Sequence, residues 1–148
     1  MIVRPLTSED LEAGRLTALF KKRVSRLPEP MGGTVASLTT WLSELMQANL
    51  EGTTSLVADD GGDQLAGLFV AIPVRILGDP VPVLGDLFMA SRRPGAMGAL
   101  LREAKRLAPL MGCRAVTATT GPLDDEAAAA WAEKNRAVCV GRSFLMEA

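Results

Sequence analysis

The sequence predicts an α/β fold, in which a mixed β-sheet is flanked by helices on both faces. Segments with apolar residues at helical spacing alternate with short apolar runs bounded by Gly and Pro, in the order β-α-α-β-β-β-α-β-α-β. Elements that alternate in this way pack economically as layers around one sheet. With 148 residues, of which 48% are hydrophobic, the chain is long enough for one core, and we expect a single domain over residues 1–148.

The predicted elements follow one another without an interdomain linker or an internal repeat. They are a strand at 2–4, a helix from Thr7 to about residue 27, a helix from about Val35 to Leu50, strands at 55–58, 65–74 and 81–89, a helix from about Gly95, a strand at 115–119, a helix from Asp124 or Asp125 to Lys134, and a strand at 138–146.

The first two helices have clear sequence signals. Thr7 and Asp10 form the pattern of a capping box, which predicts a helix start, and Pro28 and Pro30 predict where that segment ends. The second helix carries apolar side chains at the positions i, i+3, i+4, i+7 and i+8 that one helix face requires. These are Leu38, Trp41, Leu42, Leu45 and Met46.

Turn residues separate the strands that follow. The acidic run at 59–63 contains two glycines and predicts that the strands at 55–58 and 65–74 form a hairpin. The second of these strands is almost continuously apolar, as in a strand buried on both faces. Pro82 stands early in the strand at 81–89, where a sheet edge or a bulge tolerates it. In the next helix, Pro109 predicts that the last turn kinks or frays.

The composition limits the function classes that need to be considered. A net charge of −1 argues against sequence-independent binding to nucleic acid, and no apolar run reaches the ~18 residues that span a membrane. The first residues lack the apolar core of a secretory signal, so we expect a cytoplasmic protein. Cys113 and Cys139 fit no metal or redox spacing and are predicted to be buried, reduced thiols.

The absence of two residue types restricts the chemistry further. The chain contains no histidine and no tyrosine. A Ser–His–Asp triad and a His-based zinc site are therefore impossible. Any proton transfer must use Asp, Glu, Lys, Cys, the α-amino group or water.

The most informative stretch of the chain is Gly85 to Gly112. It predicts an apolar strand, a short loop with Arg, Pro and Gly, and an amphipathic helix. A helix N-terminus leaves backbone N–H groups unpaired and carries a partial positive charge. A strand that leads into such a helix through a Gly-containing loop predicts an anion site, most often for phosphate.

The ordered set of segments resembles the GNAT superfamily of N-acyltransferases over nearly the whole chain. VRPLTSEDLEA is similar to the first strand and helix of the family, SLVADDGGDQLAGLFVA to its second and third strands, and DLFM to its fourth strand. GALLREAKRLAPLMGCRAVTAT resembles the helix and the fifth strand that follow, EAAAAWAEKN the late helix, and VGRSFLMEA the last strand. The resemblance implies the GNAT fold and an acyl-CoA substrate, with acetyl-CoA as the acyl donor and no metal.

The resemblance also implies a cofactor site. The family loop often has the pattern R/Q-x-x-G-x-G/A, and its backbone amides hold the pyrophosphate of acetyl-CoA. Here Arg92 and Gly95 match the first two positions, whereas Met97 replaces the second Gly or Ala and Gly98 follows it. We therefore expect the pyrophosphate at 92–98. This range includes Arg92, Arg93, Gly95, Ala96, Met97 and Gly98. The pantetheine arm is expected beside Phe88, Met89 and Ala90, at the splayed end of the strand.

The implied reaction is direct attack by a primary amine on the acetyl group, in which positioning supplies much of the rate. Asp86 is the acid on the strand beside the expected thioester channel and is the candidate catalytic base, acting directly or through water. Many enzymes of the family place a tyrosine on the late helix as the acid for the leaving thiolate. Ala132 occupies that position here, after Trp131, and Asn135, Arg136 and Ala137 replace the usual LGF.

Several alternatives remain open at this stage. Asp86 could be a strand-end residue without a catalytic role, and Asp124 and Asp125 are more simply helix caps. Trp41 and Met46 could line an acceptor pocket instead of the core. The cluster of Lys21, Lys22, Arg23 and Arg26 could be a solvated helix end or could attract an acidic substrate.

The sequence also allows functions other than catalysis. The chain could be a catalytically inactive module of the same fold that binds acyl-CoA or a partner protein, or a homodimeric structural factor. For an enzyme, the acceptor amine could belong to a small molecule or to a protein. Many relatives are dimers, so the resemblance allows a homodimer, and neither nucleic acid nor a membrane is expected as a partner.

Overall fold

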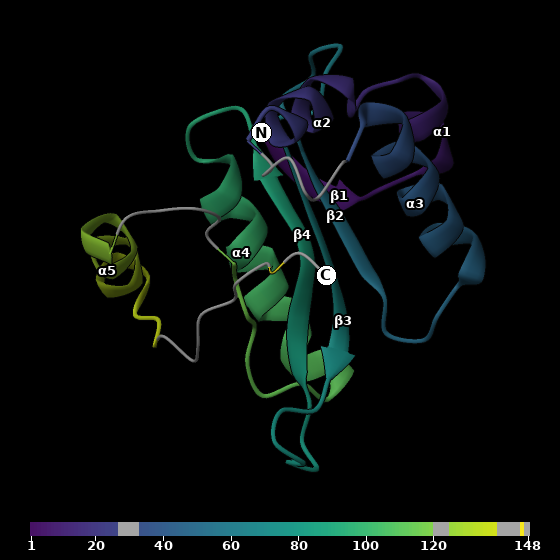
Figure 1. The fold of residues 1–148 in the computed structure, drawn as a ribbon. Coiled ribbons are helices and arrows are strands. Elements are labelled where there is room, and N and C mark those ends of the chain that lie inside the picture. Colours follow the sequence, from purple (N-terminus) through teal and green to yellow (C-terminus); the bar gives the residue numbers. More distant parts are fainter. Residues whose placement is uncertain (27–32, 120–124, 139–145, 147–148) are drawn as a thin grey trace. The chain divides into compact units, whose positions relative to one another are not determined.

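The computed structural model describes residues 1–26, 33–119, 125–138 and 146. It contains two compact units, residues 1–118 and 119–148. The larger unit contains β1 Ile2–Pro5, α1 Ser8–Glu12, α2 Thr17–Val24, α3 Val35–Ala48, β2 Thr54–Asp59, β3 Gly67–Val74, β4 Val83–Ser91, α4 Ala96–Leu107 and the 3-10 helix η2 Ala108–Met111 (Figure 1). The smaller unit contains α5 Asp125–Asn135.

A four-stranded antiparallel sheet with the order β1-β2-β3-β4 is the centre of the larger unit. The predicted hairpin is confirmed, because β2 pairs with β3 and Ala58 lies opposite Gly67. The mixed character of the sheet comes from one parallel bridge, between Leu84 of β4 and Val116. The prediction of a regular strand at 115–119 is therefore wrong. Within the described residues, the strand pairing of this segment is limited to the bridge at Val116.

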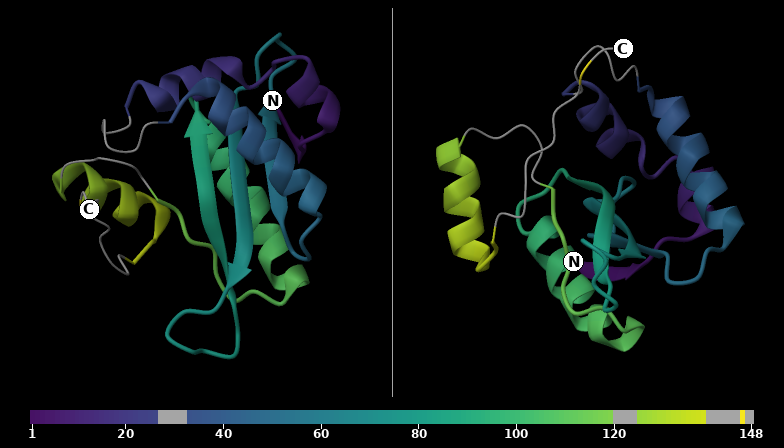
Figure 2. Two further views of the ribbon diagram at one scale, coloured as in Figure 1. Left: turned by 45° about the vertical axis from the view of Figure 1, so that its right-hand side comes forward. Right: turned by 60° about the horizontal axis from the view of Figure 1, so that its bottom comes forward.

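Helices cover both faces of the sheet, as predicted (Figure 2). On one face, α1, α2 and α3 enclose the main core, in which Phe20 and Leu42 pack with Val70 and Phe88. On the other face, α4 contacts all four strands. Gly67 permits this close approach, because a Cβ atom there would lie 2.8 Å from Leu100 Cδ1.

The first predicted helix, from Thr7 to about residue 27, is instead two helices within its described part. Thr7 caps α1 by the predicted box, since its hydroxyl accepts a hydrogen bond from the Asp10 amide and the Asp10 carboxylate accepts one from the Thr7 amide. The chain then turns at Gly14, whose φ of +66° favours glycine, and α2 begins at Thr17. Helical spacing alone misses this break because apolar residues continue on both sides of it.

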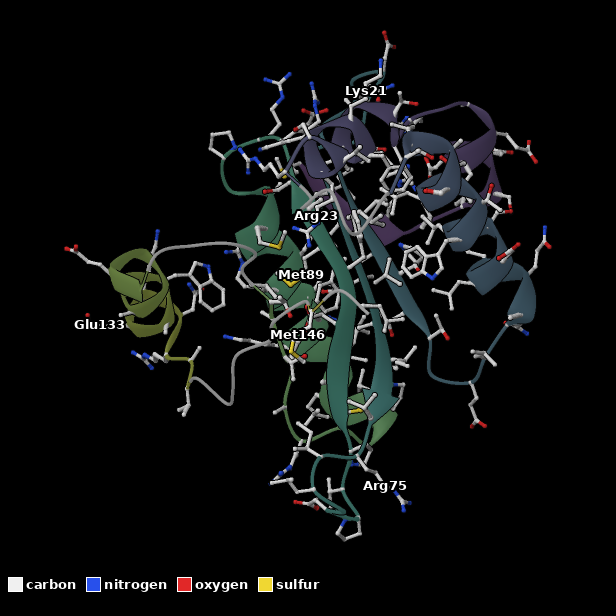
Figure 3. All side chains as sticks on the ribbon, in the orientation of Figure 1. Lys21, Arg23, Arg75, Met89, Glu133 and Met146 are labelled. Atoms are coloured by element: carbon white, nitrogen blue, oxygen red, sulfur yellow. The ribbon has the colours of Figure 1, made fainter. Side chains whose placement is uncertain are left out.

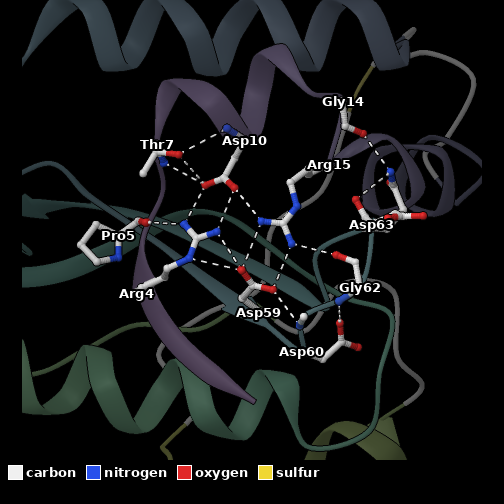
Figure 4. A network of polar contacts seen from close by, with 12 residues as sticks. Arg4, Pro5, Thr7, Asp10, Gly14, Arg15, Asp59, Asp60, Gly62 and Asp63 are labelled. Atoms are coloured by element: carbon white, nitrogen blue, oxygen red, sulfur yellow. Dashed lines mark hydrogen bonds and ion pairs between the residues drawn. The ribbon is translucent and has the colours of Figure 1, made fainter.

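The break places Arg15 in a network of two arginines and two aspartates (Figure 4). Arg4 contacts Asp10 at 2.8 Å and Asp59 at 2.9 Å, and Arg15 contacts the same two carboxylates at 3.0 Å each. Hydrogen bonds from Arg4 lower the pKa of Asp10, and those from Arg15 lower the pKa of Asp59, both well below the usual range. The network joins β1, α1 and the end of β2.

The remaining helix boundaries follow their local signals. Asn49, in the left-handed conformation, ends α3 just before the predicted boundary at Leu50. The 3-10 helix at 108–111 confirms that Pro109 changes the last turn after α4.

Cys113 is buried and has a free thiol, and burial raises the pKa of this thiol. In the smaller unit, α5 covers the predicted late helix, whereas Asp124, Cys139 and nearly all of the expected last strand lie outside the described residues.

Candidate functional site

The strand β4 contains a bulge next to Asp86. Phe88 lies opposite Val70 of β3, but Asp86 lies opposite Ala71, so Leu87 is an extra residue on β4. A bulge of this kind bends a strand and redirects the side chains beyond it. Here it directs Phe88 into the core, where its ring contacts Phe20 at 5.7 Å between centroids. The sequence carries no signal for this bulge.

The other edge of β4 pairs with the segment at 114–117. Arg114 N–H donates to Pro82 O at 3.0 Å, Leu84 N–H to Ala115 O at 2.8 Å, and Thr117 N–H to Leu84 O at 2.9 Å. At the next position, the Asp86 N–H donates to the side-chain Oγ1 of Thr117 at 3.0 Å. The same hydroxyl donates to Oδ1 of Asp86 at 2.5 Å. Thr117 therefore contacts the candidate base directly, a role that its sequence position did not indicate.

The loop after β4 is the segment for which the sequence predicts an anion site. Arg92 N–H donates to Ala66 O at 2.9 Å, which holds the start of the loop against the end of the β2–β3 connection. Gly95 then adopts a φ of +81° as the N-cap of α4, without a capping side chain. Ala96 N–H reaches Arg93 O at 3.3 Å. Within the described residues, the Met97 and Gly98 N–H groups have no acceptor.

The electrostatics of this helix start favour an anion. No acidic residue lies in the first turn of α4, so no side chain compensates the positive end of the helix dipole. Among the described residues, a Cβ atom at Gly98 would meet Arg102 Nη1 alone, at 3.5 Å, so these residues leave space for a ligand there. Arg93 contacts Asp60 at 3.5 Å, and the described residues give Arg92 no ion-pair partner.

The basic cluster at the end of α2 divides into two pairs. Lys22 Nζ donates to Ser91 O at 2.8 Å, and the Arg23 guanidinium lies 5.8 Å from the centre of the Phe88 ring. Figure 3 shows Arg23 beside β4, above Met89. Lys21 and Arg26 are exposed, as expected of a solvated helix end. Lys22 and Arg23 thus attach α2 to the end of β4 that leads into the loop.

The structure brings the predicted site residues of the larger unit into one continuous stretch. Asp86 and Phe88–Ala90 lie on β4, and 92–98 forms the loop and the first turn of α4. Trp41 packs against Phe88 at 6.3 Å between ring centroids, and Met46 packs against the main core, so both contribute to the core. Met46 also lines a surface pocket together with Leu45 and Asn49. Trp131 and Ala132 lie on α5 of the smaller unit.

Among the described helices, none is long and apolar enough to cross a membrane. In the same part of the chain, no group of three or more His, Cys, Asp or Glu side chains is placed to hold a metal ion.

The sequence matches no protein-family model and no curated protein, whereas its structure is similar to many solved structures. An aminoglycoside 6'-N-acetyltransferase from Acinetobacter haemolyticus has a TM-score of 0.67 at 17% identity, covering 100% of this chain and 98% of its own. A GNAT family acetyltransferase from Staphylococcus aureus has a TM-score of 0.62 at 16% identity, with coverages of 99% and 98%. AAC(6')-Iy, solved with a bisubstrate analog of CoA and acetylneamine, has a TM-score of 0.68 at 19% identity, with coverages of 99% and 97%.

Proposed function

Because the chain has the GNAT fold, we propose that it is an N-acetyltransferase that transfers an acetyl group from acetyl-CoA to a primary amine. One observation carries the proposal beyond the fold. The bulged strand with Asp86 leads directly into α4, and in the first turn of this helix the amides of Met97 and Gly98 have no acceptor among the residues that the structure describes. A carboxylate and an anion site are thereby held on one short stretch of backbone.

The residues present fit acetyl-CoA. The amides of Met97 and Gly98 would hold the pyrophosphate, since Gly98 has no side chain to obstruct it and Met97 would contribute through its N–H. Arg92 would add positive charge beside them. The backbone of Phe88–Ala90 would bind the pantetheine arm along the edge of β4. The structure of AAC(6')-Iy with a CoA analog supports this class of ligand for the fold.

When bound, acetyl-CoA supplies an activated acetyl thioester, and the task of the chain is mainly to orient the two reactants. Asp86 would accept the proton of the attacking amine, directly or through a water molecule. The chain has no histidine or tyrosine to act as an acid, and we propose that water supplies the proton to the departing thiolate. A thiolate is a fair leaving group, and this acid is helpful without being essential.

The acceptor is proposed to be a primary amine of a small molecule or of a protein. The free, buried thiol of Cys113 is consistent with a reducing compartment, and we keep the cytoplasm as the expected location. The net charge of −1 lacks the basic excess of a sequence-independent nucleic-acid binder, so we propose no nucleic-acid partner. Whether the active form is a monomer or a homodimer can be measured by sedimentation with and without CoA.

The test separates binding from chemistry. Titration calorimetry with CoA measures the site at 92–98, and the release of free thiol from acetyl-CoA with a panel of amines measures turnover. We expect CoA to bind and at least one amine to accelerate the release of thiol. The variant Asp86→Asn should keep the affinity for CoA and lose most of that acceleration. A wild-type chain that does not bind CoA would contradict the proposal.

A further inference from the structure

The pairing between β4 and the segment at 114–117 changes its hydrogen-bond pattern at Asp86. In a parallel pair, a residue donates its N–H to one main-chain oxygen, and the residue two positions later donates to an oxygen two positions further along. Leu84 N–H donates to Ala115 O, so Asp86 N–H should donate to the main-chain oxygen of Thr117. It donates to the hydroxyl of Thr117 instead.

The Thr117 hydroxyl uses Asp86 both as a hydrogen-bond donor and as a hydrogen-bond acceptor. It accepts from the Asp86 amide at 3.0 Å and donates its one proton to Oδ1 of the Asp86 carboxylate at 2.5 Å. A hydroxyl held at two points of the same residue fixes the direction of that carboxylate. Asp86 stands at the last position of the pairing that the described residues show, directly before the bulge at Leu87.

We propose that Thr117 is a positioning residue for Asp86, and this proposal rests on the proposed function. Its hydroxyl holds the carboxylate in the direction that receives the proton of the acceptor amine. Thr117 acts through Asp86 and is not proposed to touch either reactant. The methyl group of Thr117 has no part in this role, so serine should replace threonine and valine should not.

The first test does not depend on activity. Amide hydrogen exchange of Asp86, followed by NMR, reports directly on its bond to the hydroxyl. In Thr117→Val, which keeps the shape of the side chain, we expect exchange of the Asp86 amide to accelerate by at least about tenfold, and in Thr117→Ser we expect the wild-type rate. Equal rates in the valine variant and the wild-type protein would overturn the proposal.

The second test measures turnover with acetyl-CoA and the best amine of the panel. Thr117→Val should reduce kcat by about tenfold to a hundredfold, with the KM for acetyl-CoA changed less than about twofold. Thr117→Ser should restore the wild-type kcat. In the background of Asp86→Asn, the valine substitution should have little further effect, because Thr117 acts through Asp86.

The outcomes distinguish the two proposals. A wild-type chain that binds no CoA and releases no thiol contradicts the proposed function and the role of Thr117 with it. An active wild-type chain in which the valine and serine variants have equal turnover contradicts the role of Thr117 alone. A full additional loss from Thr117→Val in the Asp86→Asn background also overturns it, because the effect then does not pass through Asp86.

Discussion

The substitution Gly98→Ala should stabilise the protein and weaken its binding of CoA. Gly98 is the third residue of α4, and an added Cβ atom would meet only Arg102 Nη1, at an ordinary contact distance of 3.5 Å. Alanine is favoured over glycine in a helix by up to about 1 kcal/mol. For a chain of this size, we therefore expect Tm to rise by about 2–4 °C at most.

The affinity for CoA should change in the opposite direction. A Cβ atom in a helix is tilted toward the helix N-terminus, which here is the side from which the phosphate would approach the amides. If the added methyl group prevents one charged hydrogen bond, the loss is about 1.5–3 kcal/mol, or roughly a tenfold to 150-fold higher Kd. Thermal unfolding and titration calorimetry with CoA measure the two effects on the same sample.

The neighbouring residue provides a matched control. Ala99 N–H already donates to Gly95 O at 3.0 Å, so it offers no donor to a ligand. Ala99→Gly should lower Tm by a similar amount and leave the Kd for CoA unchanged. If Gly98→Ala raised Tm while its Kd for CoA stayed within about twofold of the wild-type value, the backbone at residue 98 would not be the phosphate contact, and the reasoning would be refuted.

Three further predictions concern stability. Gly67→Ala should reduce the free energy of unfolding by about 1–3 kcal/mol in urea, since its Cβ would lie 2.8 Å from Leu100 Cδ1, and an unchanged midpoint would show that α4 can move away from the sheet. Thr7→Ala should cost about 1 kcal/mol in thermal unfolding, because it removes the cap of α1; a fully retained Tm would speak against that cap. The folded-state pKa values of Asp10 and Asp59 are lowered, so their contribution to stability is complete above about pH 5 and declines as the pH falls below about 4. Asp59→Asn should flatten this decline in the urea midpoint, and a slope equal to that of the wild-type protein would contradict the assignment.

Local signals in the sequence were sufficient for most of the fold. The capping box at Thr7, the turn at 59–63 and the glycine before α4 each depend on residues within a few positions of one another. Pairing of β2 with β3 needs only a short connection. The sequence also places Asp86 and the loop at 92–98 close together, because they are neighbours along the chain.

The parts that the sequence did not predict depend on distant contacts. The turn at Gly14 is stabilised where Arg15 meets Asp59, a residue 44 positions away. The bulge at Leu87 becomes visible only in the register with β3, and apolar spacing is the same with or without it. The role of Thr117 requires the pairing across 31 positions. The assignment of individual residues to the cofactor stays a prediction until binding is measured.

The two edges of β4 differ in how they are paired, and this difference supports the site proposed at this strand. On one edge, β3 pairs with β4 along its whole length, and the loop is held as far as Arg92. On the other edge, the described pairing ends at Asp86, and between Leu87 and Ser91 no described strand lies against it. The bulge, the hydroxyl of Thr117 and the end of this pairing thus occur within two residues of one another. Among the described residues, β4 is thus paired along one edge and has no strand partner between Leu87 and Ser91 on the other. An extended ligand bound along that second edge, as proposed, would leave the core in place and would meet Asp86 at one end and the first turn of α4 at the other.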